Sequence, residues 1–312
     1  FTVVVLSGGL SHERDVSLRS GRRVTQALRE QGHTVVESDL TAGFIDLLAS
    51  TPNPVVFPVM HGGAGEDGSL HEVLKILDAP FVGSFAPAVR TAFDKAVCTP
   101  LVARAGVRTP RQRALPHDMF RELGAAKLLD ALVANMSMPL MVKPARSGSA
   151  LGCARVDDRA QLPGAIVAAY SYGDVVVVEE FIEGEEVAVG VIDTGDGPVA
   201  LPAIGIHPNS GVYDYTARYT AGETRFTIPA NLDDDVAQAC ADMALTVHGW
   251  LGLRHLSRTD IIVRDGVPVF IEANVAPGLT ETSLLPLAIE AAGDDFGEVL
   301  SRLVTAAARS ER

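Results

Sequence analysis

Apolar residues follow two different periods along the first 84 residues of the chain. Short apolar runs at residues 2–6, 33–38 and 54–60 alternate with segments whose apolar positions recur every three or four residues, as at residues 16–29. The short runs predict buried strands, and the longer segments predict amphipathic helices. Strands that alternate with helices in this way favour a parallel sheet with helices on both faces.

The rest of the chain predicts two further units of mixed α+β type. Helices around residues 92–105 and 120–134 precede an apolar strand at 140–143, and a further helix is expected at 234–251. No internal repeat or low-complexity linker separates these segments. The sequence therefore indicates an α/β protein with three domains. We expect these domains at residues 1–84, 85–182 and 183–312.

A hairpin in the last unit places oxygen-bearing side chains at its open end. Two apolar runs flank an Asp-Gly turn signal, with Asp260 before the first run and Glu272 and Asn274 at the end of the second. Glu272 and Asn274 share a face, because residues two apart on a strand point the same way. Asp260 joins that face if it pairs with Glu272. This pairing requires a bulge or an odd-numbered loop such as residues 265–267, and a two-residue loop without a bulge would place Asp260 on the opposite face.

Two carboxylates and one amide oxygen on a single face suit Mg²⁺, which keeps waters and nucleotide phosphates as its other ligands. Carboxylates at strand ends are also commonly solvated. The hairpin by itself therefore predicts a metal site made of Asp260, Glu272 and Asn274 without excluding a solvated strand end.

Composition narrows the classes of function. The chain has 312 residues, a hydrophobic content of 47% and a formal net charge of −13, which argues against nucleic acid or an anionic membrane as the main partner. Its three cysteines are scattered and show no metal-binding spacing, and no apolar run is long enough to span a membrane. We therefore expect a cytoplasmic protein with reduced thiols.

Two segments of the central unit carry residues suited to a nucleotide. Lys143 ends an apolar strand and precedes a loop of small residues at 144–152, whose backbone amides can approach a phosphate while the lysine supplies a charge. The loop lacks the Walker A order, and a flexible surface loop is the alternative. The strand at 175–179 runs from valines into acidic and apolar residues, a mixture that an adenine site needs. The alternative is a strand that ends in a solvated turn.

Two glycine-rich loops follow strands of the first unit. Residues 7–14 carry Glu13 and Arg14, and residues 61–68 begin with His61. In parallel sheets, ligands meet the loops that follow the carboxyl ends of the strands. These loops are therefore candidate parts of a binding site.

The motifs occur in an order that resembles the D-alanine–D-alanine ligases of the ATP-grasp superfamily. The resemblance runs from about residue 3 to residue 303. It rests on Gly8-Gly9-x-Ser11-x-Glu13-Arg14, His61-Gly62…Gly65-Glu66-Asp67-Gly68, Asp94-Lys95, Lys143-Pro144, Tyr213-Asp214-Tyr215, Arg258-x-Asp260 and Glu272-Ala273-Asn274-x-x-Pro277-Gly278.

The resemblance implies a role for each candidate residue. The residues assigned to ATP are Lys95, Lys143, Glu179, Phe181, Ile182, Glu186 and Arg218. Those assigned to two Mg²⁺ ions, with Mn²⁺ as a substitute, are Asp260, Glu272 and Asn274. Those assigned to the amino acids are Glu13 and His61 for the first D-alanine, Arg258 and the Gly278 amide for the oxyanion, and Ser283 and the Leu284 amide for the carboxylate of the second substrate. A lid at about residues 207–223 would close through a hydrogen-bond chain of Tyr219, Ser149 and Glu13.

The implied fold is the ATP-grasp fold, with an N-terminal parallel-sheet domain that binds substrate and two α+β domains that enclose ATP. The implied activity is ATP-dependent ligation of two D-alanines through an acyl phosphate, for peptidoglycan synthesis. A homodimer that acts on small D-amino acids, with no nucleic acid or membrane partner, is expected.

Three positions depart from the usual family sequence. Arg218 stands where a lysine is usual, residues 147–150 read Ser-Gly-Ser-Ala instead of Glu-Gly-Ser-Ser, and Glu180 replaces a common lysine. A related ligase or cyclase for another D-amino acid, such as a D-cycloserine synthetase, is the alternative. Tyr219 favours a dipeptide product over a depsipeptide. A non-catalytic nucleotide-binding regulator is a third hypothesis, against which the metal trio, both lysines and Arg258 argue.

Overall fold

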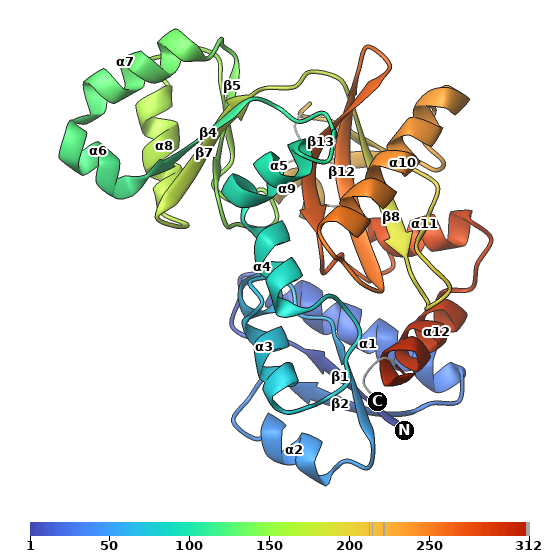
Figure 1. The fold of residues 1–312 in the computed structure, drawn as a ribbon. Coiled ribbons are helices and arrows are strands. Elements are labelled where there is room, and N and C mark those ends of the chain that lie inside the picture. Colours follow the sequence, from blue (N-terminus) through green and yellow to red (C-terminus); the bar gives the residue numbers. More distant parts are fainter. Residues whose placement is uncertain (212, 214, 221, 310–312) are drawn as a thin grey trace.

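The computed structural model describes residues 1–211, 213, 215–220 and 222–309, and its described strands form three sheets (Figure 1). The first sheet is parallel, in the order β2-β1-β3, as the alternation of short and long apolar periods predicts. Its strands are β1 (Thr2–Ser7), β2 (Thr34–Asp39) and β3 (Pro54–Pro58). The helices of this region are α1 (Arg14–Glu30), α2 (Phe44–Ser50), the 3-10 turn η1 (Gly63–Gly65) and α3 (Ser69–Ile76).

The second sheet is antiparallel, in the order β4-β7-β5-β6, and two helices bury their apolar residues against it. The strands are β4 (Gln112–Pro116), β5 (Leu140–Pro144), β6 (Ala154–Val156) and β7 (Val175–Glu180). The helices of this unit are α6 (His117–Leu123), α7 (Ala125–Asn135) and α8 (Leu162–Tyr170). The single helix expected at 120–134 is therefore wrong: the segment forms two helices that meet at Gly124, where φ is 81°.

The third sheet is also antiparallel, in the order β11-β10-β8-β12-β13, with β9 paired to β8. Its strands are β8 (Glu185–Ile192), β9 (Val199–Ala200), β10 (Ile204–Pro208), β11 (Thr224–Thr227), β12 (Leu256–Arg264) and β13 (Val267–Asn274). The accompanying helices are α9 (Tyr215–Tyr219), α10 (Asp234–Trp250), α11 (Leu284–Ala291) and α12 (Phe296–Arg309). Helix α10 packs on one face of the sheet, and α11 contributes to the core on the other.

Packing joins segments that are distant in sequence. Helices α4 (Ala86–Phe93) and α5 (Lys95–Ala103) replace the single helix expected at 92–105, and both contact β13 of the third sheet. Asp94 separates them and caps α5 by accepting a hydrogen bond from Ala96 N at 3.1 Å. Helix α12 packs on α1, so the chain returns to the first sheet at its C-terminal end (Figure 1).

The hairpin turn shows which of the two possibilities, an odd-numbered loop or a bulge, brings Asp260 opposite Glu272. Arg264 pairs with Val267, so the loop holds two residues, Asp265 and Gly266, whose φ angles of 52° and 74° fit the turn type with two left-handed residues. A bulge restores the required register, because Ile261 pairs with Phe270 whereas Asp260 pairs with Glu272. Of the two possibilities, the bulge is therefore correct, and a three-residue loop at 265–267 does not form.

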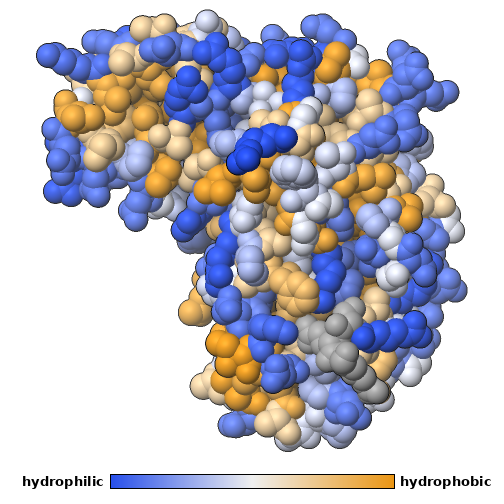
Figure 2. All heavy atoms as spheres, in the orientation of Figure 1, coloured by the Kyte–Doolittle hydropathy of each residue, from blue (hydrophilic) through white to orange (hydrophobic). Residues whose placement is uncertain are grey.

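Hydrophilic residues cover much of the face seen in Figure 2, and an apolar patch lies at the lower left, in the region of α2 and α3. The exposed large apolar residues of these two helices are Ile45, Val73 and Ile76. Over the part of the chain that the structure describes, no helix combines the length and apolar character needed to cross a bilayer.

Candidate active site

Two neighbouring cavities open where the three sheets approach one another. The first has a volume of about 470 Å³ and lies between α1, the loop after β3 and the third sheet. The second, of about 420 Å³, lies between β5, β7 and the third sheet. The residues that line both cavities are Lys95, Ser147, Tyr213, Arg218 and Glu272. The two cavities therefore form one continuous site with Glu272 at their boundary.

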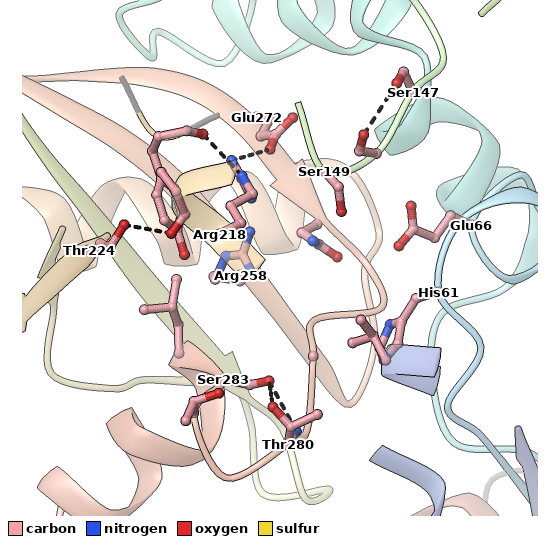
Figure 3. Close-up of a pocket in the computed structure, with 18 of the residues that line it drawn as sticks. His61, Glu66, Ser147, Ser149, Arg218, Thr224, Arg258, Glu272, Thr280 and Ser283 are labelled. Carbon is pink, nitrogen blue, oxygen red and sulfur yellow. Dashed lines mark hydrogen bonds and ion pairs between the residues drawn. The ribbon is translucent and has the colours of Figure 1, made fainter. Parts of the chain in front are cut away.

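The structure brings nearly all predicted site residues to this double cavity. The first cavity is lined by His61, Ser149, Arg218, Arg258, Glu272, Asn274, Gly278, Ser283 and Leu284 (Figure 3). The second is lined by Lys95, Lys143, Glu179, Phe181, Ile182, Glu186 and Arg218. Glu13 and Asp260 lie directly behind the lining residues, bonded to Ser149 and Arg258. The side chain of Tyr219, predicted to close the lid, lies outside the described residues.

The predicted metal residues share one end of the β12–β13 hairpin. Asp260 lies opposite Glu272 in the ladder, and Asn274 lies opposite Arg258. Arg258 donates two hydrogen bonds to Asp260, at 2.6 Å and 2.8 Å, and both side chains are buried. The amide oxygen of Asn274 accepts a hydrogen bond from Ala276 N at 3.0 Å, which fixes its orientation.

Positive charges surround Glu272. Lys95 Nζ lies 3.3 Å from its carboxylate, and Arg218 lies 4.0 Å away. Burial alone would raise the pKa of Glu272, but the charges of Lys95, Arg218 and Lys143 hold it well below its ordinary range. Glu272 is therefore ionised throughout the physiological pH range.

This donor set fits a hard cation. Among the described residues no group of three His, Cys, Asp or Glu side chains forms a metal cluster of its own. The set of Asp260, Glu272 and Asn274 offers only three side chains, so a cation held here would need ligands from elsewhere, such as phosphate and water. An ionised Glu272 opposite Asp260 suits Mg²⁺ bound together with a nucleotide.

The second cavity holds a buried lysine at the end of β5. Lys143 forms an ion pair with Glu179 of β7, and both side chains are almost fully buried. Burial alone would lower the pKa of Lys143, but the charge of Glu179 raises it above its ordinary value. Lys95 Nζ donates to the Ser147 carbonyl at 2.9 Å and so ties the glycine-bearing loop to α5. Two ammonium groups therefore face the loop that was predicted to contact phosphates.

The far end of the second cavity has apolar walls and one perturbed carboxyl group. Phe181 and Ile182 line it, and the Arg155 guanidinium lies 4.3 Å from the centre of the Phe181 ring. Burial raises the pKa of Glu186 to about 7. Glu180, which departs from the family pattern, forms an ion pair with Arg264 at 3.0 Å.

The first cavity contains a buried acidic pair. Ser149 donates a hydrogen bond to Glu13, at the start of α1. This contact is one link of the expected Tyr219–Ser149–Glu13 hydrogen-bond chain. Glu66 approaches the same point from the loop after β3 (Figure 3), and burial together with the charge of Glu13 raises its pKa to about 8. A Cβ on Gly148 would lie 3.0 Å from Glu13 Oε2 and 3.3 Å from Glu66 Oε2, so a larger residue here would require both carboxylates to shift.

Sequence reasoning did not assign a role to Glu66, although the residue stands in the glycine-rich motif after β3. The sequence signal that could have indicated a role for Glu66 was its position between Gly65 and Gly68. The sequence could not show that the side chain turns inward, because η1 and the approach of Glu13 decide its direction.

His61 connects the first sheet to the loop that follows β13. Its Nδ1 lies 3.0 Å from the Ala276 carbonyl, and its Nε2 lies 3.1 Å from Ser20 Oγ. Burial lowers the pKa of His61, so the ring is neutral at physiological pH, with Nδ1 donating and Nε2 accepting. The loop that follows β13 ends at Ser283, the residue before α11. Ser283 Oγ accepts a hydrogen bond from Thr280 N at 3.0 Å.

Comparison with known proteins places the chain in a family. Residues 101–305 match the family model described as D-ala D-ala ligase C-terminus. A D-alanine–D-alanine ligase from Fervidobacterium nodosum is 35% identical over 98% of both chains, and one from Syntrophotalea carbinolica is 37% identical over 98% of this chain and 95% of its own.

Solved structures agree with the sequence relatives. A D-alanine–D-alanine ligase from Bacillus anthracis, 26% identical, superimposes with a TM-score of 0.84 over 100% of this chain and 98% of its own. The VanG D-Ala:D-Ser ligase from Enterococcus faecalis, 27% identical, gives the same TM-score over 98% and 99%. The Bacillus anthracis enzyme also has a structure in complex with ATP, 25% identical to this chain, with a TM-score of 0.83 over 99% and 98%. The continuous double cavity, the motifs that line it and these full-length similarities lead to one conclusion: this chain belongs to the D-alanine–D-alanine ligase family of ATP-dependent ligases and has the ATP-grasp fold.

Proposed function

We propose that this protein joins two D-alanines into D-alanyl-D-alanine for peptidoglycan synthesis, with release of ADP and phosphate. The observation that carries the proposal is the continuity of the two cavities at Glu272. One cavity has the lysines and apolar walls that suit ATP. The other has Glu66 in its lining, Glu13 behind Ser149 and the N-terminus of α11, which suit amino acids. A γ-phosphoryl group at their boundary would be within reach of both substrates.

The proposed ligation takes place in two steps. A carboxylate oxygen of the first D-alanine attacks the γ-phosphorus, and the bond to the bridging oxygen of ADP breaks, which leaves an acyl phosphate. The amine of the second D-alanine then attacks the acyl carbon, the C–N bond forms, and phosphate leaves as the amine gives up its proton to solvent. Lys95, Lys143 and Arg218 neutralise the charge that spreads over the transferred group.

Mg²⁺ held by Asp260, Glu272 and Asn274 would neutralise phosphate charge further when bound, and Mn²⁺ offers similar chemistry. Glu13 binds the ammonium of the first D-alanine beside His61. Arg258 and the Gly278 amide stabilise the oxyanion of the tetrahedral intermediate, a role worth about 3–4 kcal/mol per donor.

The second D-alanine places its carboxylate at Ser283 and the Leu284 amide, the first residue of α11. Phe181, Ile182, Glu179 and Glu186 hold the adenosine. A lid over about residues 207–223, with the Tyr219–Ser149–Glu13 chain, shields the acyl phosphate from water. Residues 212, 214 and 221 of this segment lie outside the described residues.

The departures from the family pattern leave the ATP machinery in place. Arg218 keeps a positive charge near Glu272 and lies over the Tyr213 ring at 4.4 Å. Glu180 pairs with Arg264. The sequence relatives at 35% and 37% identity are D-alanine–D-alanine ligases by name, whereas the VanG D-Ala:D-Ser ligase is 27% identical. Another acceptor, or a ring closure of the D-cycloserine type, is therefore not favoured.

A phosphate-release assay with ATP, Mg²⁺ and single or paired D-amino acids tests the proposal. D-Alanine alone should stimulate release, and mass spectrometry should identify D-alanyl-D-alanine as the product. Release that D-serine or another D-amino acid stimulates and D-alanine does not would overturn the assignment of substrate. ATP turnover that no amino acid stimulates would overturn ligation altogether.

We further propose three domains at residues 1–84, 85–182 and 183–312, a homodimeric state and a cytoplasmic location. The three sheets support the division, because each of these ranges contains one of them. Light scattering coupled to size-exclusion chromatography measures the mass: a value near that of one 32.9 kDa chain would contradict the dimer.

A further inference from the structure

One face of α1 forms the wall of the first cavity beside the loop that leads into α11. Leu279 N donates to Ser20 Oγ at 3.3 Å, and Arg23 donates to the Thr280 carbonyl at 2.5 Å. Arg19 lies one turn before Arg23 on the same face, because residues four apart on a helix are neighbours. Arg19 also lines the cavity, so the face of α1 that anchors this loop contributes a basic residue to the wall of the site.

Arg19 differs from the other cations of this cavity in its partners. Each of the others is paired with a carboxylate: Lys95 and Arg218 with Glu272, and Arg258 with Asp260. The exposed side chain of Arg19 makes no hydrogen bond or ion pair with any described residue. A positive charge at the rim of the cavity is therefore available to a ligand.

The loop beside Arg19 provides neutral donors. Ser283 Oγ is bonded to Thr280 N at 3.0 Å and to Thr280 Oγ1 at 2.8 Å, and the Leu284 amide starts α11. Hydroxyl and amide groups orient a carboxylate, but a charged donor binds it more strongly. The guanidinium of Arg19 on α1 would therefore supply the positive charge that pairs with the carboxylate of an amino acid bound at this loop.

We propose that Arg19 binds the carboxylate of the acceptor D-amino acid at the rim of the first cavity and selects acceptors that carry one. This inference rests on the proposed function and adds a specificity residue to it. The planar guanidinium matches a carboxylate with two parallel N–H donors. Bound in this way, the acceptor keeps its amine free to turn towards the acyl carbon deeper in the cavity.

A competition between two acceptors tests the role of Arg19. D-Alanine and D-alaninamide are supplied together with ATP and Mg²⁺, and the ratio of D-alanyl-D-alanine to D-alanyl-D-alaninamide is measured by mass spectrometry. D-Alaninamide lacks the carboxylate, so it reacts only as the acceptor. The ratio does not depend on how much enzyme is active, and the different basicity of the two amines cancels when variants are compared.

Arg19→Ala should shift the product ratio towards the amide by about tenfold, because one charged hydrogen bond to the acceptor is lost. Arg19→Lys should retain part of the preference for the carboxylate. Arg22→Ala removes an exposed arginine from the same helix that does not line the cavity, and should leave the ratio unchanged.

An unchanged ratio in Arg19→Ala would overturn the inference while leaving the proposed function standing, and so would an equal shift in Arg22→Ala. Wild-type protein that makes neither product would instead overturn the proposed function.

Discussion

Asp260 lies directly opposite Glu272 in the β12–β13 ladder, although only two residues form the hairpin turn between their strands. The bulge between Phe270 and Glu272 compensates for the even-numbered turn and brings both carboxylates to one end of the sheet. Lys95 and Arg218 reach Glu272 there and keep it ionised. This pairing places the proposed metal site at the boundary of the two cavities.

Glu272→Gln should reduce turnover by about 100-fold or more, because it removes the charge of a proposed metal ligand, whose effect amounts to several kcal/mol. Phosphate release is measured over a range of Mg²⁺ concentrations, with thermal unfolding as the control for the fold. Turnover close to that of the wild type at every Mg²⁺ concentration, with an unchanged melting curve, would contradict the metal role.

Glu66 should make the stability of the protein depend on pH. Its pKa rises from 4.5 to about 8 on folding. Between these values the folded protein binds a proton that the unfolded chain has released. The free energy of unfolding therefore falls as pH rises, by on the order of 1.4 kcal/mol per pH unit, and it levels off above pH 8.

Glu66→Gln mimics the protonated acid at every pH. The variant should therefore match the wild type at pH 5 and be more stable than it at pH 9, when unfolding by denaturant is measured at both values. A difference in stability that is the same at pH 5 and pH 9 would show that Glu66 does not bind the proton.

Gly148→Ala should weaken binding of the first D-alanine, because the new methyl group would displace Glu13 and Glu66. We expect the KM for D-alanine to rise about tenfold, which corresponds to a loss of about 1.4 kcal/mol, while the melting temperature changes little.

Gly164→Ala is the matched control, since nothing lies within 4 Å of the added atom and the residue is inside α8. It should leave the KM unchanged and stabilise the helix by about 0.5–1 kcal/mol. Equal kinetic effects of the two alanines would contradict the proposed contact.

Glu186 should make nucleotide affinity depend on pH near neutrality. Its pKa is raised to about 7, and only the ionised carboxylate accepts hydrogen bonds from both ribose hydroxyls. The Kd for ATP, measured calorimetrically, should be several-fold lower at pH 8 than at pH 6. Glu186→Gln should flatten this dependence, and a variant that keeps the full wild-type dependence would exclude Glu186 as its source.

Local sequence patterns determined most of the strands and helices of this protein and the residue types available for its chemistry. The short valine-rich strands β1 and β7, the helix α10 and the motif around Lys143 follow from periodicity and from residue types that act over a few positions. The order of motifs along the chain also supplied the residues that we propose for ATP, a cation and the amino acids.

Tertiary structure decided which of these groups meet and in what state. The bulge before Glu272, the inward direction of Glu66 and the contact of Arg23 with Thr280 depend on residues far apart in the chain. Burial and the charge of Glu13 raise the pKa of Glu66, and positive charges on other elements lower the pKa of Glu272 against the effect of burial; no local pattern encodes these contacts. The sequence therefore supplied the candidate residues, whereas their pairing and protonation required the packed fold.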